Sequence, residues 1–370
     1  MAHSIKAVGK AVALMLAGLA AQTAHATAYF DLGANITATG VSSDGGVVAA
    51  YDTAHYYAWT AAGGVTPIGG AWTGGIASVS ADGTLISGSA YGVGATVQAA
   101  VYDLAAGRWK RLGGIGGESD GSASSAWGIA GNGESVVGLG WVDAGTAHAV
   151  QSTPAGTLQD LGSAGGSSRA NGVNYDGSIV VGWEEQSTGY WQGAYWQNGV
   201  ATLMFDNDGV AMSSAEAVSA DGKWIVGDAG YGVQTWRYNT ATGATQYLGD
   251  ADPFGDVQGA TGISADGRVV VGYDRSFGPP TFGMGTIWID GLGMRNLTDY
   301  ALGQGIDLNG RTLALPLGVS ADGLTVVGLD NQYHGFVLTL APVPEPASWA
   351  LMGAGVAGLL LVRRRRANAA

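Results

Sequence analysis

One recurring phrase limits the folds that this 370-residue chain can adopt. Its clearest copies are VSADGKWIVG at 218, ISADGRVVVG at 263 and VSADGLTVVG at 319, and looser copies begin at 41, 79, 129 and 173. An Asp-Gly pair between two apolar runs predicts a tight β-hairpin, because Gly accepts the positive φ of the turn. The chain is therefore expected to be a series of similar hairpins.

The spacing of the seven copies predicts the unit that is repeated. The turn residues are Asp44, Asp82, Asn132, Asp176, Asp221, Asp266 and Asp322, which lie 38 to 56 residues apart. A third strand with an aromatic residue follows in most copies, as in GAYWQ at 193 and TIWID at 286, and a fourth often ends in Leu-Gly. This period is typical of a four-stranded propeller blade. We expect an all-β fold, a seven-bladed β-propeller of four-stranded antiparallel blades.

The turn acids are interpreted as structural residues. Asp and Asn at such positions bond to the backbone of their own turn, and Asn132 cannot act as a carboxylate. A catalytic or metal-binding ring of these residues is not expected.

The last copy lacks a fourth strand. After residues 334–340 the repeat pattern stops, whereas Tyr29–Gly33, with no repeat before it, matches the Leu-Gly strand of the other copies. We expect this N-terminal strand to complete the last blade and close the ring, which would leave only short, protected edges.

The first 26 residues have the pattern of a secretory signal peptide. Lys6 and Lys10 flank an apolar run, and Ala24-His25-Ala26 is a typical cleavage site. Cleavage by signal peptidase after Ala26 would leave a propeller domain at 27–341.

Residues 342–370 carry a second targeting pattern. Pro344, Glu345 and Pro346 precede an apolar stretch at 347–362 and the cluster Arg363, Arg364, Arg365 and Arg366. The stretch is short for a transmembrane helix, and the arginines would hold its end in the cytoplasm. This order resembles the PEP-CTERM sorting signal. The resemblance implies export, transient anchoring in the inner membrane, processing by an exosortase and delivery to the cell surface or extracellular matrix. A plain membrane anchor is the alternative.

The repeats themselves resemble HAF-type extracellular repeats. The nearest forms of the third-strand motif are Ala147-His148-Ala149 and His334-Gly335-Phe336. That resemblance implies an extracellular propeller and no particular activity. The PEP-CTERM resemblance adds an association with exopolysaccharide or biofilm.

Charge and composition exclude several classes of function. Residues 27–342 carry 10 basic and 28 acidic side chains, a surface that repels nucleic acid. There is no cysteine, so disulfides and thiolate metal sites are excluded, and the five histidines lack metal-ligand spacing. No cofactor is expected, although Ca²⁺ is a weak candidate.

The long-link face, formed by the links between second and third strands and between blades, is the expected ligand surface. Its links are longer than the Asp-Gly turns and carry acids beside aromatics, which suit hydroxyl donors, cations and sugar rings. The candidate binding residues are Tyr51, Asp52, Tyr91, Trp141, Asp143, Trp183, Glu184, Asp228, Tyr231, Tyr273, Asp274, Asp330 and Tyr333. In the alternative interpretation, the aromatics cap the core and the acids keep the rim soluble.

Three functions stay open at this point. The first is a non-catalytic binding or structural module of the envelope or matrix. The second is a polysaccharide-active hydrolase or lyase that uses acids of the long-link face, and the third is a protein-interaction scaffold. A propeller fold does not decide between them.

Overall fold

The computed structural model describes residues 27–72, 74–92, 96–116, 122–231, 234–251, 257–275 and 282–342. Thr27–Leu340 form one compact unit. The predicted signal peptide and the predicted sorting residues from 344 onward, including the transmembrane segment 347–362, lie outside the described residues. In the described part of the chain, no helix is long and apolar enough to cross a membrane.

The unit is almost entirely antiparallel β-sheet, as the repeats predict. Among the described residues, five sheets have four strands each. Their strands, in order of pairing, are β2 (Thr37–Val41), β3 (Val48–Tyr51), β4 (Tyr56–Thr60) and β5 (Gly64–Gly69); β6 (Ser78–Val79), β7 (Leu85–Tyr91), β8 (Val97–Asp103) and β9 (Arg108–Arg111); β10 (Ser124–Ile129), β11 (Val136–Trp141), β12 (Ala147–Ser152) and β13 (Leu158–Asp160); β14 (Ser168–Val173), β15 (Ile179–Glu185), β16 (Trp191–Gln197) and β17 (Val200–Leu203); and β1 (Ala28–Ala34), β28 (His334–Thr339), β27 (Thr325–Asp330) and β26 (Leu313–Val319).

A further sheet has eight strands because β19 pairs with strands of two successive repeats. Residues 224–226 of β19 pair with β20, and residues 228–231 pair with β22. The strands are β18 (Ala215–Val218), β19 (Trp224–Tyr231), β20 (Trp236–Asn239), β21 (Thr245–Tyr247), β22 (Val257–Ile263), β23 (Val269–Arg275), β24 (Met284–Ile289) and β25 (Gly293–Asn296).

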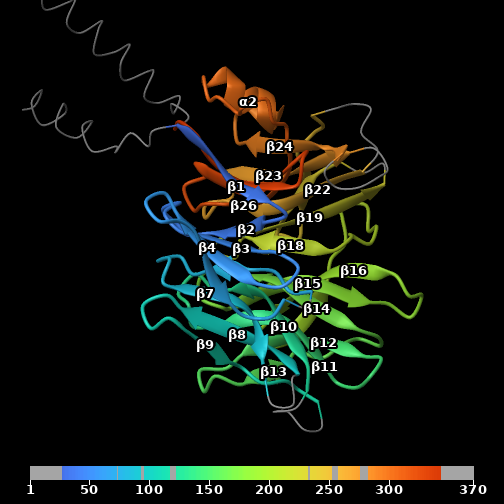
Figure 1. Ribbon diagram of the computed structural model, residues 1–370. Helices are drawn as coiled ribbons and strands as arrows, with labels where there is room; N and C mark the ends of the chain where they lie inside the picture. The colour runs from blue at the N-terminus through green and yellow to red at the C-terminus, as the bar shows by residue number, and fades with distance from the viewer. Residues whose placement is uncertain are drawn as a thin grey trace, which may run out of the picture. The chain divides into compact units, whose positions relative to one another are not determined.

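The sheets follow one another in a closed order. The first strands contact each other in the sequence β2, β6, β10, β14, β18, β22 and β26, and β26 contacts β2 again. Figure 1 shows the consequence: β2, near the start of the chain, lies beside β26, and β1 pairs with β28 from its end.

Hydrogen bonds explain why the Ser-x-Asp-Gly phrase recurs. In the last copy the Ser320 hydroxyl donates to Asp322 Oδ1 at 2.6 Å and accepts the N–H of Thr325 at 2.8 Å, while Asp322 accepts the N–H of Leu324. The copies at Ser42, Ser80, Ser219 and Ser264 make the same bonds. The interpretation of these aspartates as turn-forming residues is confirmed.

The Gly that ends each of the last five phrases is required by a close approach of two strands. First strands carry a β-bulge, for example between Ala170 and Gly172 in β14. The bulge brings the carbonyl of Arg169 so close to Gly182 that a Cβ at position 182 would collide with it. Only a residue without a side chain fits there.

The N-terminal strand closes the array, as predicted. β1 pairs with β28 from Ala28 opposite Thr339 to Ala34 opposite His334. Leu32 is buried in a core cluster with Val337 of its own sheet and Val48 of the next sheet. The closing strand therefore contributes to the packing between the last and first sheets.

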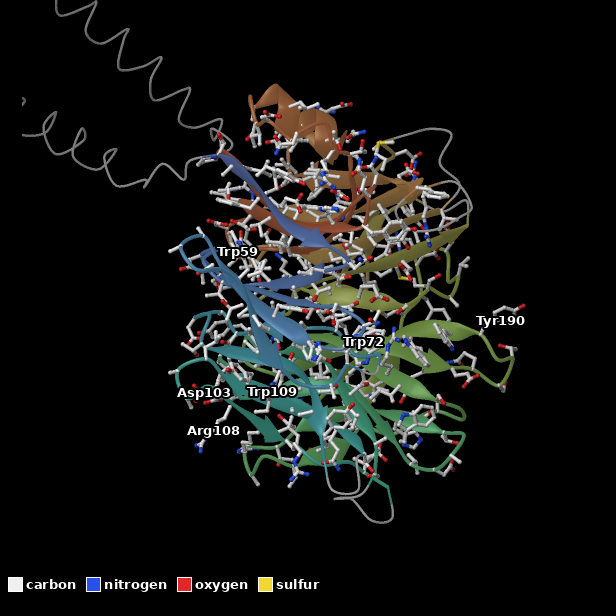
Figure 2. All side chains as sticks on the ribbon, in the orientation of Figure 1. Trp59, Trp72, Asp103, Arg108, Trp109 and Tyr190 are labelled. Atoms are coloured by element: carbon white, nitrogen blue, oxygen red, sulfur yellow. The ribbon has the colours of Figure 1, made fainter. Side chains whose placement is uncertain are left out.

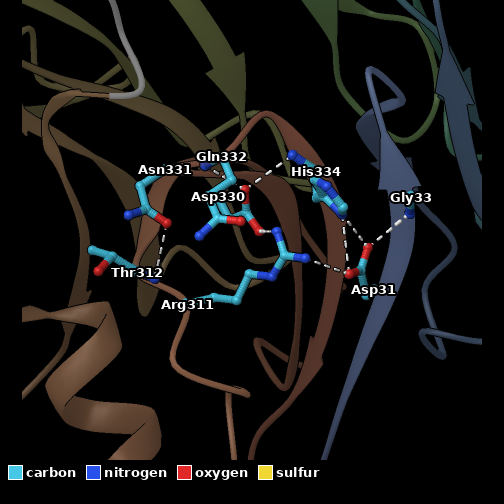
Figure 3. A network of polar contacts seen from close by, with 8 residues as sticks. All are labelled: Asp31, Gly33, Arg311, Thr312, Asp330, Asn331, Gln332 and His334. Carbon is cyan, nitrogen blue, oxygen red and sulfur yellow. Dashed lines mark hydrogen bonds and ion pairs between the residues drawn. The ribbon is translucent and has the colours of Figure 1, made fainter.

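A polar network, shown in Figure 3, spans this closure. Asp31 of β1 accepts hydrogen bonds from Arg311 Nη2 at 3.0 Å and from the N–H of Gly33 at 2.8 Å, and its carboxylate lies 2.9 Å from His334 Nδ1. Arg311 Nη1 also donates to the fully buried Asp330 at 2.7 Å. Burial opposes ionisation of Asp31, but the bonds from His334 and Gly33 and the nearby positive charges hold its pKa below the usual value.

The first strands surround a narrow channel. Two cavities of about 170 Å³ each lie along it, one lined by Thr39, Trp127, Asn171 and Glu216 among others, the second at the Asp-Gly turns. At the turn end, the residue before each Asp bonds to its counterpart in the next sheet, as in Ala265 N–H to Ala321 O at 3.0 Å.

One helix departs from the predicted pattern. α2 (Leu297–Gly303) follows β25 and accounts for much of the longest repeat spacing. The Asn296 side chain caps its start by accepting the N–H of Asp299, and Leu297 and Ala301 are buried. In the sequence, the sign of this helix is the spacing of the apolar residues Leu297 and Ala301, and such a short pattern does not distinguish a helix from a loop.

Candidate functional site

The candidate residues on the long-link face differ in exposure. Exposed side chains are Tyr91, Trp141, Asp143 and Tyr333; half-buried ones are Tyr51, Asp52 and Asp228; buried ones are Trp183, Glu184, Tyr273, Asp274 and Asp330. The side chain of Tyr231 lies outside the described part, as do the signal and sorting residues.

Several of the candidate acids have local structural partners. Asp330 belongs to the closure network, and Glu184 accepts the N–H of Ala164 at 2.7 Å. Asp52 accepts the N–H groups of its own turn and the Tyr57 hydroxyl, and these bonds lower its pKa although burial opposes them. Asp143 is exposed and accepts the N–H groups of Gly145 and Thr146.

Three of the candidates occupy the same position in successive repeats. Trp183, Asp228 and Tyr273 each follow the Gly that ends the second-strand phrase, in β15, β19 and β23. A depression of about 430 Å³ lies on the long-link face at this place, lined by Tyr190, Trp191, Asp228, Tyr273 and Arg275 among others. It is the candidate site that the described residues of this face form.

Stacked aromatic rings form one side of the depression. The rings of Trp191 and Trp183 lie 4.3 Å apart and nearly parallel. Trp183 is buried beneath, whereas Trp191 is 56% exposed and Tyr190 79% exposed. Figure 2 shows Tyr190 at the tip of the link between β15 and β16, pointing away from the sheets. Two exposed aromatic residues on a supported loop are a suitable surface for an apolar ring face.

Arg169 supports this aromatic wall from the channel side. Its guanidinium lies 3.7 Å from the ring centre of Trp127 and 5.3 Å from that of Trp183. It also donates from Nε to Asn171 Oδ1 at 2.6 Å. Burial lowers the pKa of Arg169, and the charges of Glu216 and Asp228 act against this shift. Stacking of this kind holds a charged group in a fixed place.

A hydrogen-bonded acid and phenol form the other side. The Tyr273 hydroxyl donates to Asp228 Oδ1 at 2.8 Å, and the Arg275 guanidinium lies 5.1 Å from the centre of the Tyr273 ring. Burial raises the pKa of Asp228, against the bond from Tyr273 and the charges of Arg275 and Arg169. Burial and the adjacent Asp228 charge also raise the pKa of Tyr273. The depression thus offers a carboxylate acceptor beside aromatic surface.

Glu216 lines the channel and is joined by a hydrogen bond to Ser214, which lines the depression. Its Oε1 accepts the Ser214 hydroxyl at 2.6 Å and Asn171 Nδ2 at 3.1 Å. The side chain faces the channel and is partly accessible, yet protein atoms surround it. Burial, and then the charge of Asp228, raise the pKa of Glu216 to about 7, against the Ser214 bond and the Arg169 charge.

The sequence-based list missed Arg169, Tyr190, Trp191, Glu216 and Arg275 as ligand candidates. One signal for them was available in the repeats. Glu216 occupies the bulge position at which the other first strands carry residues such as Thr39, Trp127 and Asn171, so an acid there departs from the pattern. Their proximity to one another depends on which sheets are neighbours, and no single repeat contains that information.

Comparison with known proteins identifies one segment. Residues 342–366 match the PEP-CTERM protein-sorting motif, which confirms the predicted sorting signal. This motif indicates an exported protein that an exosortase processes. No curated protein matches the chain.

Comparison with solved structures concerns the fold alone. A chain of the structure "Crystal Structure of Mitotic Checkpoint Complex" is 14% identical with a TM-score of 0.53, and the match covers 87% of this chain and 94% of that one. TolB from Acinetobacter baumannii is 14% identical with a TM-score of 0.45, covering 72% of this chain and 63% of that chain. A putative TolB from Agrobacterium tumefaciens is 15% identical with a TM-score of 0.42, covering 84% and 91%. The two TolB scores are too low to support an argument.

Proposed function

We propose that this exported protein is a non-catalytic binding module that holds a saccharide in the depression between Trp191 and Asp228. The observation that carries the proposal is the exposed Trp191 ring, stacked on a buried Trp183 and facing a site with a carboxylate acceptor. A sugar has an apolar ring face and a rim of hydroxyl donors, and this site offers a partner for each.

The scaffold in this proposal is a seven-bladed propeller built from HAF-like repeats. The strand pairing supports the blade count if β18–β21 and β22–β25, which share one sheet, are taken as two blades. A rigid ring would keep the long-link face in shape, so that little ordering free energy is lost when a ligand binds.

The ligand is proposed to be exopolysaccharide of the cell surface or biofilm matrix. Export and exosortase processing would bring the protein there, after transient anchoring through residues 347–362. The acidic surface of residues 27–342 favours a neutral glycan over an anionic one.

Binding is tested with short oligomers of β-1,4-glucose and of β-1,4-N-acetylglucosamine, titrated into the purified protein by calorimetry. Trp191→Ala should weaken binding by roughly fivefold, since losing an aromatic platform costs on the order of 1 kcal/mol. The matched control is Trp141→Ala, which removes another exposed tryptophan at the end of β11.

Three outcomes oppose the proposal. If Trp191→Ala and Trp141→Ala weaken binding equally, the ligand contacts several loops of the long-link face and is not held in the depression. Absence of binding to any oligomer would overturn the saccharide assignment. Release of new reducing ends or unsaturated products during the incubation would favour a hydrolase or lyase.

A further inference from the structure

Two carboxyl groups lie close together between the channel and the depression. Asp228 of β19 lines the depression, and Glu216 of the adjacent strand β18 lines the channel. Ser214 connects them, since its hydroxyl donates to Glu216 and its backbone carbonyl accepts the N–H of Asp228 at 3.0 Å. The ligand site and the channel carboxyl therefore share one support.

Among the described residues, the groups that act on the ionisation of this pair lie on neighbouring strands. β14 contributes Arg169, and β23 contributes Arg275 and the Tyr273 hydroxyl. Burial disfavours an ionised Asp228, and the phenol, Arg275 and Arg169 act against this effect. Burial and the Asp228 charge disfavour a second negative charge on Glu216. With a pKa of about 7, Glu216 is only partly protonated at neutral pH and can take up a further fraction of a proton.

We propose that Glu216 binds a proton when a saccharide fills the depression, so that affinity for the ligand decreases as the pH rises through neutrality. This inference rests on the proposed binding function. The ligand displaces the solvent that screens Asp228, and the unscreened carboxylate then repels negative charge on Glu216 more strongly.

The sign and size of the effect follow from linkage. A pKa that is higher in the complex than in the free protein means proton uptake on binding, so binding is strongest below the pKa of the free protein. If the ligand raises the pKa by about one unit, the dissociation constant increases about fivefold between about pH 6 and pH 8. Glu216→Gln keeps an acceptor for Ser214 and mimics the neutral acid, so it should bind with the high affinity at every pH.

The first experiment needs no ligand. Carbon-13 NMR of the glutamate carboxyls in the full chain should show one group that titrates near pH 7 and disappears in Glu216→Gln. The exposed Glu134, replaced by Gln, is the control and should leave that signal unchanged. A Glu216 midpoint below about pH 5, near the ordinary value for glutamate, would overturn the proposal.

The second experiment is calorimetry with the same glucose and N-acetylglucosamine oligomers across this pH range. The expected result is a several-fold loss of affinity with rising pH that is absent in Glu216→Gln. Binding that stays constant across the range would overturn the linkage and leave the binding function intact. Absence of binding at any pH would overturn the binding function itself.

Discussion

Replacement of Arg311 by Met tests whether a buried charge holds the closure network together. Arg311 donates to Asp330, whose side chain is fully buried, and to Asp31, whose side chain is 35% exposed. The two contacts are expected to differ in energy because water screens only the second.

The expected loss of stability in Arg311→Met follows from this difference in screening by water. Removing one partner of a buried pair costs about 3–5 kcal/mol, and the low end applies because Asp330 keeps the N–H groups of Gln332 and His334. The contact with Asp31 adds less than about 1 kcal/mol. For a unit of this size, about 3 kcal/mol corresponds to a melting temperature lower by roughly 5 °C.

Thermal unfolding followed by circular dichroism, in parallel for three variants, provides the assay. Asp31→Asn should cost less than about 1 kcal/mol. The double variant Arg311→Met with Asp330→Asn should recover much of the single-variant loss, because no unpaired charge is then left in the interior. The reasoning is refuted if Arg311→Met costs no more than Asp31→Asn.

Two further predictions concern the repeat phrase. Gly182→Ala should lower stability by about 1–3 kcal/mol, because its Cβ collides with the Arg169 carbonyl, and an unchanged melting temperature would argue against the bulge. The second prediction concerns acid: bonds from the Ser80 hydroxyl and the Thr84 N–H lower the pKa of Asp82, so its contribution to stability is present above its unfolded value of 3.8 and is lost as the pH falls below it. Melting temperatures from about pH 6 to pH 2 should fall less in Asp82→Asn than in the wild type, and an identical fall would contradict this role.

Local patterns in the sequence were sufficient to predict the strands and the closure. The hydrogen bonds of each Asp-Gly turn join residues a few positions apart, so one repeat is enough to determine the geometry of its turn. The match of residues 29–33 to the missing fourth strand depended only on counting strands, and the observed pairing of β1 with β28 confirms it.

The candidate site was harder to predict because its side chains come from different repeats. The sequence placed Asp228 and Tyr273 on the correct face, but their hydrogen bond joins residues 45 positions apart. The burial of each side chain was equally hard to predict. Trp183 and Trp141 occupy similar places near the ends of second strands, yet Trp183 is buried and Trp141 is exposed. Whether an aromatic residue packs or faces solvent depends on its neighbours in space.

The account depends most on the closure of the array by the first strand, which an engineered disulfide tests directly. Ala28 and Thr339 face each other in the pairing of β1 with β28, and the chain contains no other cysteine. Paired antiparallel residues lie within the Cα separation that a disulfide spans. The variant carrying Ala28→Cys and Thr339→Cys should form an intramolecular disulfide when dissolved oxygen oxidises the two thiols, with no free thiol left in the folded monomer. Two free thiols in the folded monomer, or disulfides formed only between molecules, would contradict it.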